Sequence, residues 1–369
     1  MEHKEHFHGS DLEKIEQMYH IKKEDIISFS SNVNPLGISP LMKQEMVKKI
    51  DCITAYPDRE YTSLKKSIAD YAGCSSNHII VGNGSSELIS ILIKILKPKK
   101  ALILAPTYSE YERELQLNQC ETSYYALHES LDFHLDIADF KKELQNQYDF
   151  LVICNPNNPT STTILTADIA NILDTAKEYG IFVMIDETYI EFTDDIAAYS
   201  SVALTKTFDN VAVLRGTSKF FASPGLRLGY GITSNTFLLD EINFKKNPWM
   251  IHSLAVVAGE VMFSDNEYIS KTNNYIQAER KRIYDIFKNI SDVKAYEPTA
   301  NFILIRFLNP KASAFDLFHF LICKNIMIRN CKTFPFLDES YFRFCFLEKN
   351  QNDLLIYEIK HYIESIAIS

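Results

Sequence analysis

The sequence predicts an α/β protein with two parts: a large domain built on a mostly parallel sheet, and a smaller C-terminal α+β domain. Between about residues 60 and 235, short apolar runs alternate with amphipathic stretches of helical period. This alternation is typical of a parallel sheet that helices cover on both faces. After residue 249 the pattern changes to a compact mixture of strands and helices. The length of 369 residues also exceeds the roughly 100–200 residues of a common domain.

Five apolar runs in the first part have the length of buried strands, and helical patterns separate them. The predicted strands are residues 79–82, 101–105, 150–154, 181–185 and 211–214. The predicted helices between them include residues 62–71, 85–96 and 167–179. In the C-terminal part we expect helices over residues 275–289, 314–324 and 353–365, with strands over residues 301–306, 326–329 and 341–346.

These patterns divide the chain into three segments. Residues 1–35 form an N-terminal arm, residues 36–245 the large domain, and residues 246–369 the small C-terminal domain. No low-complexity linker separates the two domains, so we expect a helix near residues 235–275 to join them.

Composition excludes several classes of partner. A net charge of −10 argues against a nucleic-acid footprint or an anionic membrane surface. No apolar run approaches the roughly 20 residues of a membrane helix, and the N-terminus lacks a secretory apolar region. The seven cysteines form no CxxC pair, which indicates reduced thiols. We therefore expect a cytoplasmic globular protein that binds neither nucleic acid nor membrane.

Glycine is scarce, with 11 residues, and six of them fall in two short segments. The first segment, Gly82-Asn-Gly-Ser-Ser-Glu87, follows a predicted strand and opens a predicted helix. The N–H groups of a helix N-terminus and the hydroxyls of Ser85 and Ser86 are suited to bind an anion. Taken alone, an ordinary strand-to-helix turn explains these residues better.

The second segment runs from Val213 to Gly231 and contains Lys219, with Arg227 eight positions later between two glycines. A lysine on a rigid turn can form a Schiff base, and a nearby arginine can hold a phosphate. The alternative is a buried lysine at the start of a helix beside a surface arginine. The pattern resembles the cofactor lysine of aminotransferase-superfamily enzymes, which use pyridoxal 5′-phosphate.

Polar residues follow three further predicted strands. Asp186 ends the strand over residues 181–185, where ligand clefts of parallel sheets open, and a carboxylate there can pair with a pyridine nitrogen. The alternative is a helix N-cap. Tyr189 and Asn158 can both reach the phenolic oxygen of a pyridoxal ring that is bound in this way. Asn158 belongs to Asn155-Pro-Asn-Asn-Pro-Thr160, and taken alone an ordinary Asn-Pro turn explains this segment better. Tyr108 can stack on the ring or pack in the core.

The order of these segments resembles fold type I pyridoxal-phosphate enzymes of the class I/II aminotransferase superfamily, over essentially the whole chain. The resemblance implies a three-layer large domain that binds the cofactor. Two branches share these motifs: histidinol-phosphate aminotransferases and threonine-phosphate decarboxylases. Several stretches look closer to the decarboxylases: His8-Gly9 and residues 29–37, 224–230, 248–249, 258–260, 327–331 and 337–343.

The resemblance assigns roles to individual residues. It implies that Lys219 forms the Schiff base and that Asp186 and Tyr189 act beside it. Tyr56 is expected to reach the cofactor phosphate of a neighbouring subunit in a homodimer that shares its active sites. The implied cofactor-binding set also includes Gly84, Ser85, Ser86, Tyr108, Asn158, Ser218 and Arg227. The implied substrate-binding residues are His8, Asn32, Arg329 and Arg343.

The chain departs from the decarboxylase pattern at three places. The arm carries Ser10-Asp11 instead of Gly-Asn, and an acidic Asp11 is unfavourable near an anionic substrate unless it points away or faces an amine. Ser161 stands where a glycine is usual, and Gly216 where a hydroxyl residue is common. His3, His6 and His8 have no acidic or cysteine partner at ligand-like spacing, so we expect no metal site.

We therefore interpret the chain as a pyridoxal-phosphate enzyme that acts on a small phosphorylated amino acid or amine. The preferred reaction is α-decarboxylation of O-phospho-threonine or O-phospho-serine, as in the cobamide pathway. The alternative reaction is transamination of the histidinol-phosphate type. A non-catalytic, ligand-binding relative is the remaining alternative, and the presence of Lys219, Asp186, Tyr189 and Arg227 argues against it.

Overall fold

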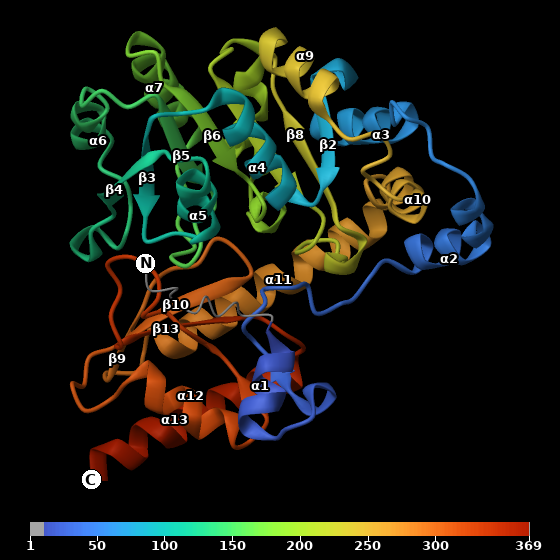
Figure 1. Ribbon diagram of the computed structural model, residues 1–369. Helices are drawn as coiled ribbons and strands as arrows, with labels where there is room; N and C mark the ends of the chain where they lie inside the picture. Colours follow the sequence, from blue (N-terminus) through green and yellow to red (C-terminus); the bar gives the residue numbers. More distant parts are fainter. Residues whose placement is uncertain (1–10, 369) are drawn as a thin grey trace.

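The computed structural model describes residues 11–368 of the chain. A wide sheet with helices on both faces forms the larger part of the molecule, and a smaller sheet with the C-terminal helices forms the other (Figure 1). The long helix α11 (Asn266–Phe287) lies between the two parts. Within the part of the chain that the structure describes, no helix is long and apolar enough to cross a membrane.

The large sheet has seven strands in the order β2-β8-β7-β6-β5-β3-β4. Only β8 is antiparallel to its neighbours β2 and β7, and the other pairs are parallel, which confirms the predicted sheet type. The strands are β2 (Ile79–Asn83), β3 (Lys100–Ala105), β4 (Glu121–Ala126), β5 (Phe150–Cys154), β6 (Phe182–Asp186), β7 (Val211–Gly216) and β8 (Leu228–Ile232).

Two of these strands are missing from the sequence prediction. β4 is a sheet edge with the sequence Glu-Thr-Ser-Tyr-Tyr-Ala, so it carries no apolar run. β8 reads Leu-Gly-Tyr-Gly-Ile, and its glycines weaken the strand signal.

Helices cover both faces of the large sheet, which gives the three layers. Along β3, Ala101 and Ile103 pack with side chains of α4, α5 and α9, whereas Leu102 and Leu104 belong to the core on the α6 and α7 side. A strand buried on both faces needs apolar residues at every position, which explains the continuous apolar runs. The helices from α1 to α7 are α1 (Leu12–Tyr19), α2 (Pro40–Lys48), α3 (Thr62–Ala72), α4 (Ser85–Leu96), α5 (Glu110–Leu117), α6 (Ile137–Glu143) and α7 (Thr166–Glu178).

The smaller part contains a four-stranded antiparallel sheet in the order β12-β13-β10-β9. Its strands are β9 (Val293–Ala295), β10 (Phe302–Phe307), β12 (Arg329–Asn330) and β13 (Tyr341–Cys345). A separate parallel pair joins β1 (Ile27–Ser28) to β11 (Ile326–Met327), so the N-terminal segment lies against the smaller part. The remaining helices are α8 (Ile196–Tyr199), α9 (Thr236–Lys245), α10 (Ser253–Met262), α12 (Ala314–Ile322) and α13 (Lys349–Ile368).

Several predicted boundaries differ from the structure. The single helix expected near residues 235–275 is instead α9, α10 and the first turns of α11, and α10 packs against α2 and α3. The run over residues 326–329 forms the two short strands β11 and β12 in different sheets. The domain limits at residues 35 and 245 stay predictions. Short 3-10 helices connect the main elements: η1 (Lys23–Asp25), η2 (Ile50–Thr54), η3 (Ser76–His78), η4 (Glu129–Leu131), η5 (Ile190–Phe192), η6 (Val202–Lys206) and η7 (Pro224–Leu226).

Candidate active site

A cavity of about 450 Å³ lies between the large sheet and the small one. Its walls come from the ends of β5 and β6, the first turn of α4, the segment after β7, and the strands β12 and β13. The chain therefore brings together side chains that are up to about three hundred residues apart in sequence. The predicted site residues that line the cavity are Asn32, Ser85, Ser86, Tyr108, Asn158, Asp186, Tyr189, Ser218, Lys219, Arg227, Arg329 and Arg343.

Three predicted site residues are not in this lining. Gly84 directly precedes α4 and adjoins the guanidinium of Arg227. Tyr56 is 79% exposed, and its ring packs on Trp249 with a centroid distance of 4.5 Å, outside the cavity. His8 lies outside the described residues, as do His3 and His6.

Two glycines shape one end of the cavity. Gly84 has a φ of +79°, in the left-handed region that favours glycine. A side chain at Gly84 would collide with Arg227, and a side chain at Gly229 would collide with the backbone of Gly84 and Ser85. Because both lack side chains, Arg227 and β8 lie directly against the first turn of α4. The N-terminus of α4, the hydroxyls of Ser85 and Ser86 and the guanidinium of Arg227 together suit an anionic group.

Lys219 lines the cavity, and its ammonium Nζ donates to the carbonyl oxygen of Ser31 over 2.6 Å. Burial, together with the positive charges of Arg343 and Arg227, lowers the pKa of Lys219 from 10.5 to about 8. With this pKa, roughly one tenth of the amine is neutral at pH 7. The neutral amine is the form that attacks a carbonyl carbon.

Asp186 ends β6, and both of its carboxylate oxygens accept hydrogen bonds. The hydroxyl of Tyr111 donates to Oδ2 over 2.7 Å. The backbone N–H and the hydroxyl of Thr188 donate to Oδ1 over 2.9 and 2.6 Å. No helix begins directly after Asp186, because η5 starts at Ile190 with Tyr189 as its N-cap residue. The helix N-cap alternative for Asp186 is therefore wrong.

Tyr111 and Thr188 were not predicted from the sequence as site residues. Tyr111 stands three positions after Tyr108 at the start of α5, where a buried aromatic residue is typical of a helix that packs on a sheet. The one sequence feature that could have pointed to Tyr111 is the second tyrosine of the segment Thr107-Tyr-Ser-Glu-Tyr111.

Asn32 and Tyr189 meet beside Lys219. The Asn32 amide donates to the Tyr189 hydroxyl over 3.2 Å, and the Asn32 carbonyl oxygen Oδ1 is buried and accepts no hydrogen bond in the described part of the protein. Asn32 also has a φ of +57°. A buried acceptor at the cavity wall is costly unless a ligand donor reaches it.

Arg343 is a buried cation whose hydrogen-bond partners are neutral. The side chain is 4% exposed and donates to the side-chain oxygen of Asn158 and to the carbonyl oxygen of Ser30. Its Nε has no partner among the described residues, and its guanidinium lies 5.3 Å from the ring centroid of Phe302.

Arg329 and Arg343 are directly paired across β12 and β13. Paired residues of neighbouring strands point to the same face, and like charges at such positions repel each other. Burial lowers the pKa of Arg329 to about 10, with Arg343 as the next cause, and Asp11 acts in the opposite direction. The two arginines therefore form a positively charged wall opposite the α4 end of the cavity.

The structure gives physical accounts of two departures from the family pattern. Ser161 has a φ of +61°, which explains why glycine is usual there. Its hydroxyl accepts from the backbone N–H groups of Thr299 and Ala300 over 3.1 and 2.9 Å. A side chain at Gly216 would meet the nearest hydroxyl, that of Ser85, at 3.4 Å, so the site has room for a small residue.

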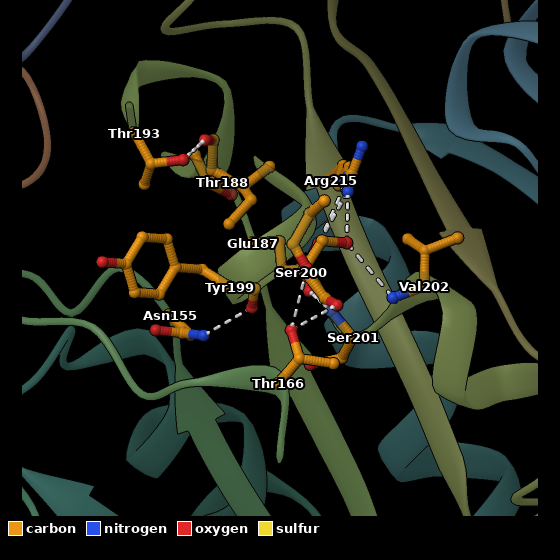
Figure 2. A network of polar contacts seen from close by, with 12 residues as sticks. Asn155, Thr166, Glu187, Thr188, Thr193, Tyr199, Ser200, Ser201, Val202 and Arg215 are labelled. Carbon is orange, nitrogen blue, oxygen red and sulfur yellow. Dashed lines mark hydrogen bonds and ion pairs between the residues drawn. The ribbon is translucent and has the colours of Figure 1, made fainter. Parts of the chain in front are cut away.

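A second polar cluster surrounds Glu187, the residue that follows Asp186 (Figure 2). Arg215 donates through Nε and Nη2 to one oxygen of Glu187 over 3.0 and 2.8 Å. Ser200 donates to the same carboxylate over 3.0 Å, and the backbone N–H of Ser201 donates to its other oxygen over 2.5 Å. The cluster ties the segment between β6 and β7 to both strands. Among residues 11–368, no group of three His, Cys, Asp or Glu side chains is arranged to hold a metal ion.

Comparison with known proteins agrees with this architecture. The family model for aminotransferase class I and II matches residues 24–359. A candidate threonine-phosphate decarboxylase of Caldanaerobacter subterraneus subsp. tengcongensis is 38% identical over 327 residues, or 88% of this chain and 87% of the relative. The threonine-phosphate decarboxylase of Salmonella typhimurium is 30% identical over 360 residues, or 98% of this chain and 97% of the relative.

A solved structure extends the comparison to the other branch. The histidinol-phosphate aminotransferase of Clostridium acetobutylicum has a TM-score of 0.85 and 33% identity, with 91% of this chain and 99% of that chain covered. The match confirms the three-layer fold that the resemblance implied. The chain belongs to the class I and II aminotransferase family.

Proposed function

We propose that the protein is a pyridoxal-phosphate enzyme that acts on a small phosphorylated amino acid. One observation carries the proposal. Among the described residues that line the cavity, Lys219, Arg227, Arg329 and Arg343 are cationic, and only Asp186 is anionic. This excess of positive charge is divided between two ends of one cavity, so it suits two separate anionic groups.

The residues at the α4 end fit the cofactor. Its phosphate would be held by Ser85, Ser86, Ser218, Arg227 and the N-terminus of α4. Asp186 would pair with the ring nitrogen, Tyr189 and Asn158 would reach the phenolic oxygen, and Tyr108 would contact the ring face. When bound, pyridoxal phosphate withdraws electrons from a bond that is broken at the α-carbon of the substrate.

The side chains of the protein prepare this chemistry. The lowered pKa of Lys219 supplies a neutral amine for covalent attachment of the cofactor and later a base or acid near the α-carbon. Asn32 and Tyr189, which are hydrogen-bonded to each other, form the wall beside Lys219.

The arginine wall is proposed to bind the phosphate of the substrate. A guanidinium can grip a phosphate through two parallel hydrogen bonds, and it stays charged. If Arg329 and Arg343 hold the phosphate, the α-carboxylate stays free to leave as carbon dioxide. The two relatives named as threonine-phosphate decarboxylases, at 38% and 30% identity, support decarboxylation of O-phospho-threonine or O-phospho-serine.

The test is a side-by-side measurement of carbon dioxide and keto-acid formation with O-phospho-threonine and O-phospho-serine. We expect carbon dioxide as the main product. The Arg343→Lys variant should lose roughly 1.5–3 kcal/mol of transition-state stabilisation, the worth of a hydrogen bond to a charged group. It should also give a larger share of keto acid. Equal product ratios in both proteins would argue against a role of Arg343 in choosing the reaction.

The competing function is transamination of the histidinol-phosphate type. The 33% identity to the Clostridium acetobutylicum enzyme favours it, because the arginine wall would accept histidinol phosphate as well. Faster keto-acid formation than carbon dioxide release in the wild-type protein would establish this alternative.

We further propose a homodimer in which Tyr56 enters the cavity of the neighbouring subunit. Apolar side chains at α2, η2 and the residues after them are exposed: Leu41, Val47, Ile50, Ile53 and Tyr56. An exposed apolar face of this kind is typical of an interface. Light scattering should give twice the mass of the chain. Mixing inactive Lys219→Ala and Tyr56→Ala subunits should restore activity, because one cavity of the mixed dimer is then complete, whereas sites built within one chain would regain none.

A further inference from the structure

The carboxylate of Asp186 is fixed by donors from two different elements. Tyr111 reaches Oδ2 from α5, and Thr188 reaches Oδ1 from the segment after β6. The three donor–acceptor distances lie between 2.6 and 2.9 Å, within the range of hydrogen bonds to charged acceptors. Because each oxygen has its own donor, the carboxylate plane cannot rotate without breaking a bond.

Tyr111 has little freedom to release its bond. The side chain is 1% exposed, and its ring packs edge-on against Tyr108 with a centroid distance of 5.5 Å. Burial raises the pKa of Tyr111 well above its ordinary value, and the charge of Asp186 raises it further. The hydroxyl therefore remains protonated, and so can donate, at neutral pH.

We infer that Tyr111 is a positioning residue, which holds the Asp186 carboxylate in the orientation that the ring nitrogen of pyridoxal phosphate requires. The inference rests on the proposed function, because it takes Asp186 as the partner of that nitrogen. A carboxylate that is already oriented pays no reorganisation cost when the ligand arrives. Without Tyr111, Asp186 keeps only the Thr188 donors on one oxygen, so it faces the ring nitrogen for a smaller part of the time.

The chain offers a matched control for the loss of one buried hydroxyl. Tyr61 is also 1% exposed, and its hydroxyl bonds the backbone N–H and carbonyl of Ile251 over 2.9 and 3.3 Å. Tyr61 does not line the cavity. Tyr61→Phe therefore removes a buried hydrogen-bonding group of the same kind without touching Asp186.

The experiment compares Tyr111→Phe and Tyr61→Phe in the full-length protein. After removal of bound cofactor, the dissociation constant of pyridoxal phosphate is measured by absorbance titration. The ring nitrogen is then observed by NMR with 15N-labelled pyridoxal phosphate, and thermal unfolding of the cofactor-free protein reports stability. Tyr111→Phe should raise the dissociation constant about tenfold and move the nitrogen signal toward that of unprotonated pyridine. Tyr61→Phe should leave the nitrogen signal unchanged and the dissociation constant within about twofold.

Two results would overturn the inference. The first is an equal dissociation constant and an equal nitrogen signal in both variants while the wild-type protein binds pyridoxal phosphate; this leaves the proposed function intact. The second is a wild-type protein that binds no pyridoxal phosphate, which removes the proposed function as well. If Tyr111→Phe does not fold, Thr188→Val takes its place, since it removes a donor from the other oxygen and should move the nitrogen signal in the same direction.

Discussion

Asp186 and Glu187 are neighbours in the chain, yet their carboxylates lie in two separate polar clusters. The Glu187 cluster pairs a carboxylate with a guanidinium, and both side chains are almost fully buried, at 0% and 4% exposure. The Asp186 cluster opens into the cavity, where one carboxylate faces four cationic side chains among the described lining residues. In the Glu187 cluster, the negative and positive charges of the protein cancel each other. In the Asp186 cluster, the protein leaves an excess of positive charge.

The difference separates structural polar groups from functional ones. A buried ion pair with satisfied hydrogen bonds, such as Glu187 with Arg215, needs no further partner. Buried cations that face only neutral acceptors, such as Arg343, cost folding free energy that an anionic ligand recovers. The comparison therefore predicts opposite consequences for similar substitutions in the two clusters.

The largest effect is expected at Lys219. Lys219→Ala should abolish covalent trapping of pyridoxal phosphate by borohydride and lower the reaction rate on the order of 10³-fold or more. In the wild-type protein, the trapped cofactor should be found on the peptide that contains Lys219.

The pH dependence of trapping sharpens this prediction. With a pKa of about 8, the neutral amine of cofactor-free protein increases about tenfold per pH unit below pH 8 and levels off above it. The initial rate of cofactor capture should follow the same curve. A midpoint near the ordinary lysine value of 10.5 would show that the cavity does not depress this pKa.

The next largest effect concerns the stability of the balanced cluster. Arg215→Met should lower the free energy of unfolding by about 3–5 kcal/mol, because the Glu187 carboxylate is then buried without its cation. Denaturant unfolding of the cofactor-free protein measures this loss. The double variant Arg215→Met with Glu187→Leu should recover a large part of it, since no unpaired charge remains. A loss below about 1 kcal/mol in the single variant would mean that water reaches Glu187.

A third prediction uses Glu191, which lies beside the balanced cluster. Burial raises the pKa of Glu191 from 4.5 to about 7; Arg215 and a backbone hydrogen bond oppose the shift, and Glu187 adds to it. The negative charge of Glu191 in turn adds to the effect of burial in raising the pKa values of Tyr71 and Tyr230, whose hydroxyls therefore stay neutral. One of its oxygens has no hydrogen-bond partner within the described chain, which is consistent with a protonated carboxyl.

The direction in which stability changes with pH follows from whether Glu191 holds its proton in the folded and in the unfolded protein. Between pH 4.5 and about 7 the unfolded chain releases the Glu191 proton while the folded protein keeps it, so stability falls as pH rises. The contribution of this group is fully present below pH 4.5 and lost above about pH 7, a change of about 3 kcal/mol. Glu191→Gln should remove this part of the pH dependence in unfolding experiments at pH 5 and pH 8. Equal slopes in both proteins would contradict the raised pKa.

Site residues could be predicted from the sequence where they stand in a recognisable motif at the end of a predicted strand. Lys219, Arg227 and Asp186 stand at strand ends in motif segments, and the structure places all three at the cavity. The continuous apolar runs predicted five of the seven strands of the large sheet, because both faces of that sheet are covered.

Features that depend on register or on distant partners could not be derived in this way. The role of Arg215 as an ion-pair partner depends on Glu187, which follows the end of another strand. The alignment of Arg329 with Arg343 depends on how β12 pairs with β13, and one residue of slippage would turn the side chains to opposite faces. Tyr111 was hidden because a buried tyrosine on a helix is indistinguishable from a packing residue until its acceptor is known.

The smallest effect on stability is expected at Arg343, and it completes the comparison with Arg215. Arg343→Met removes a buried cation of similar exposure, but it leaves behind only the neutral oxygens of Asn158 and Ser30 and relieves the repulsion from Arg329. The loss of hydrogen bonds and the gain from removing a buried charge oppose each other. We therefore expect the free energy of unfolding of the ligand-free protein to change by no more than about 1 kcal/mol.

Phosphate or O-phospho-threonine should raise the unfolding temperature of the wild-type protein, since a ligand that binds only the folded state stabilises it. The same ligands should stabilise Arg343→Met less, whereas Arg215→Met, if folded, should keep its response. A loss in Arg343→Met as large as that in Arg215→Met would show that both clusters are structural, and the distinction drawn between the two clusters would be wrong.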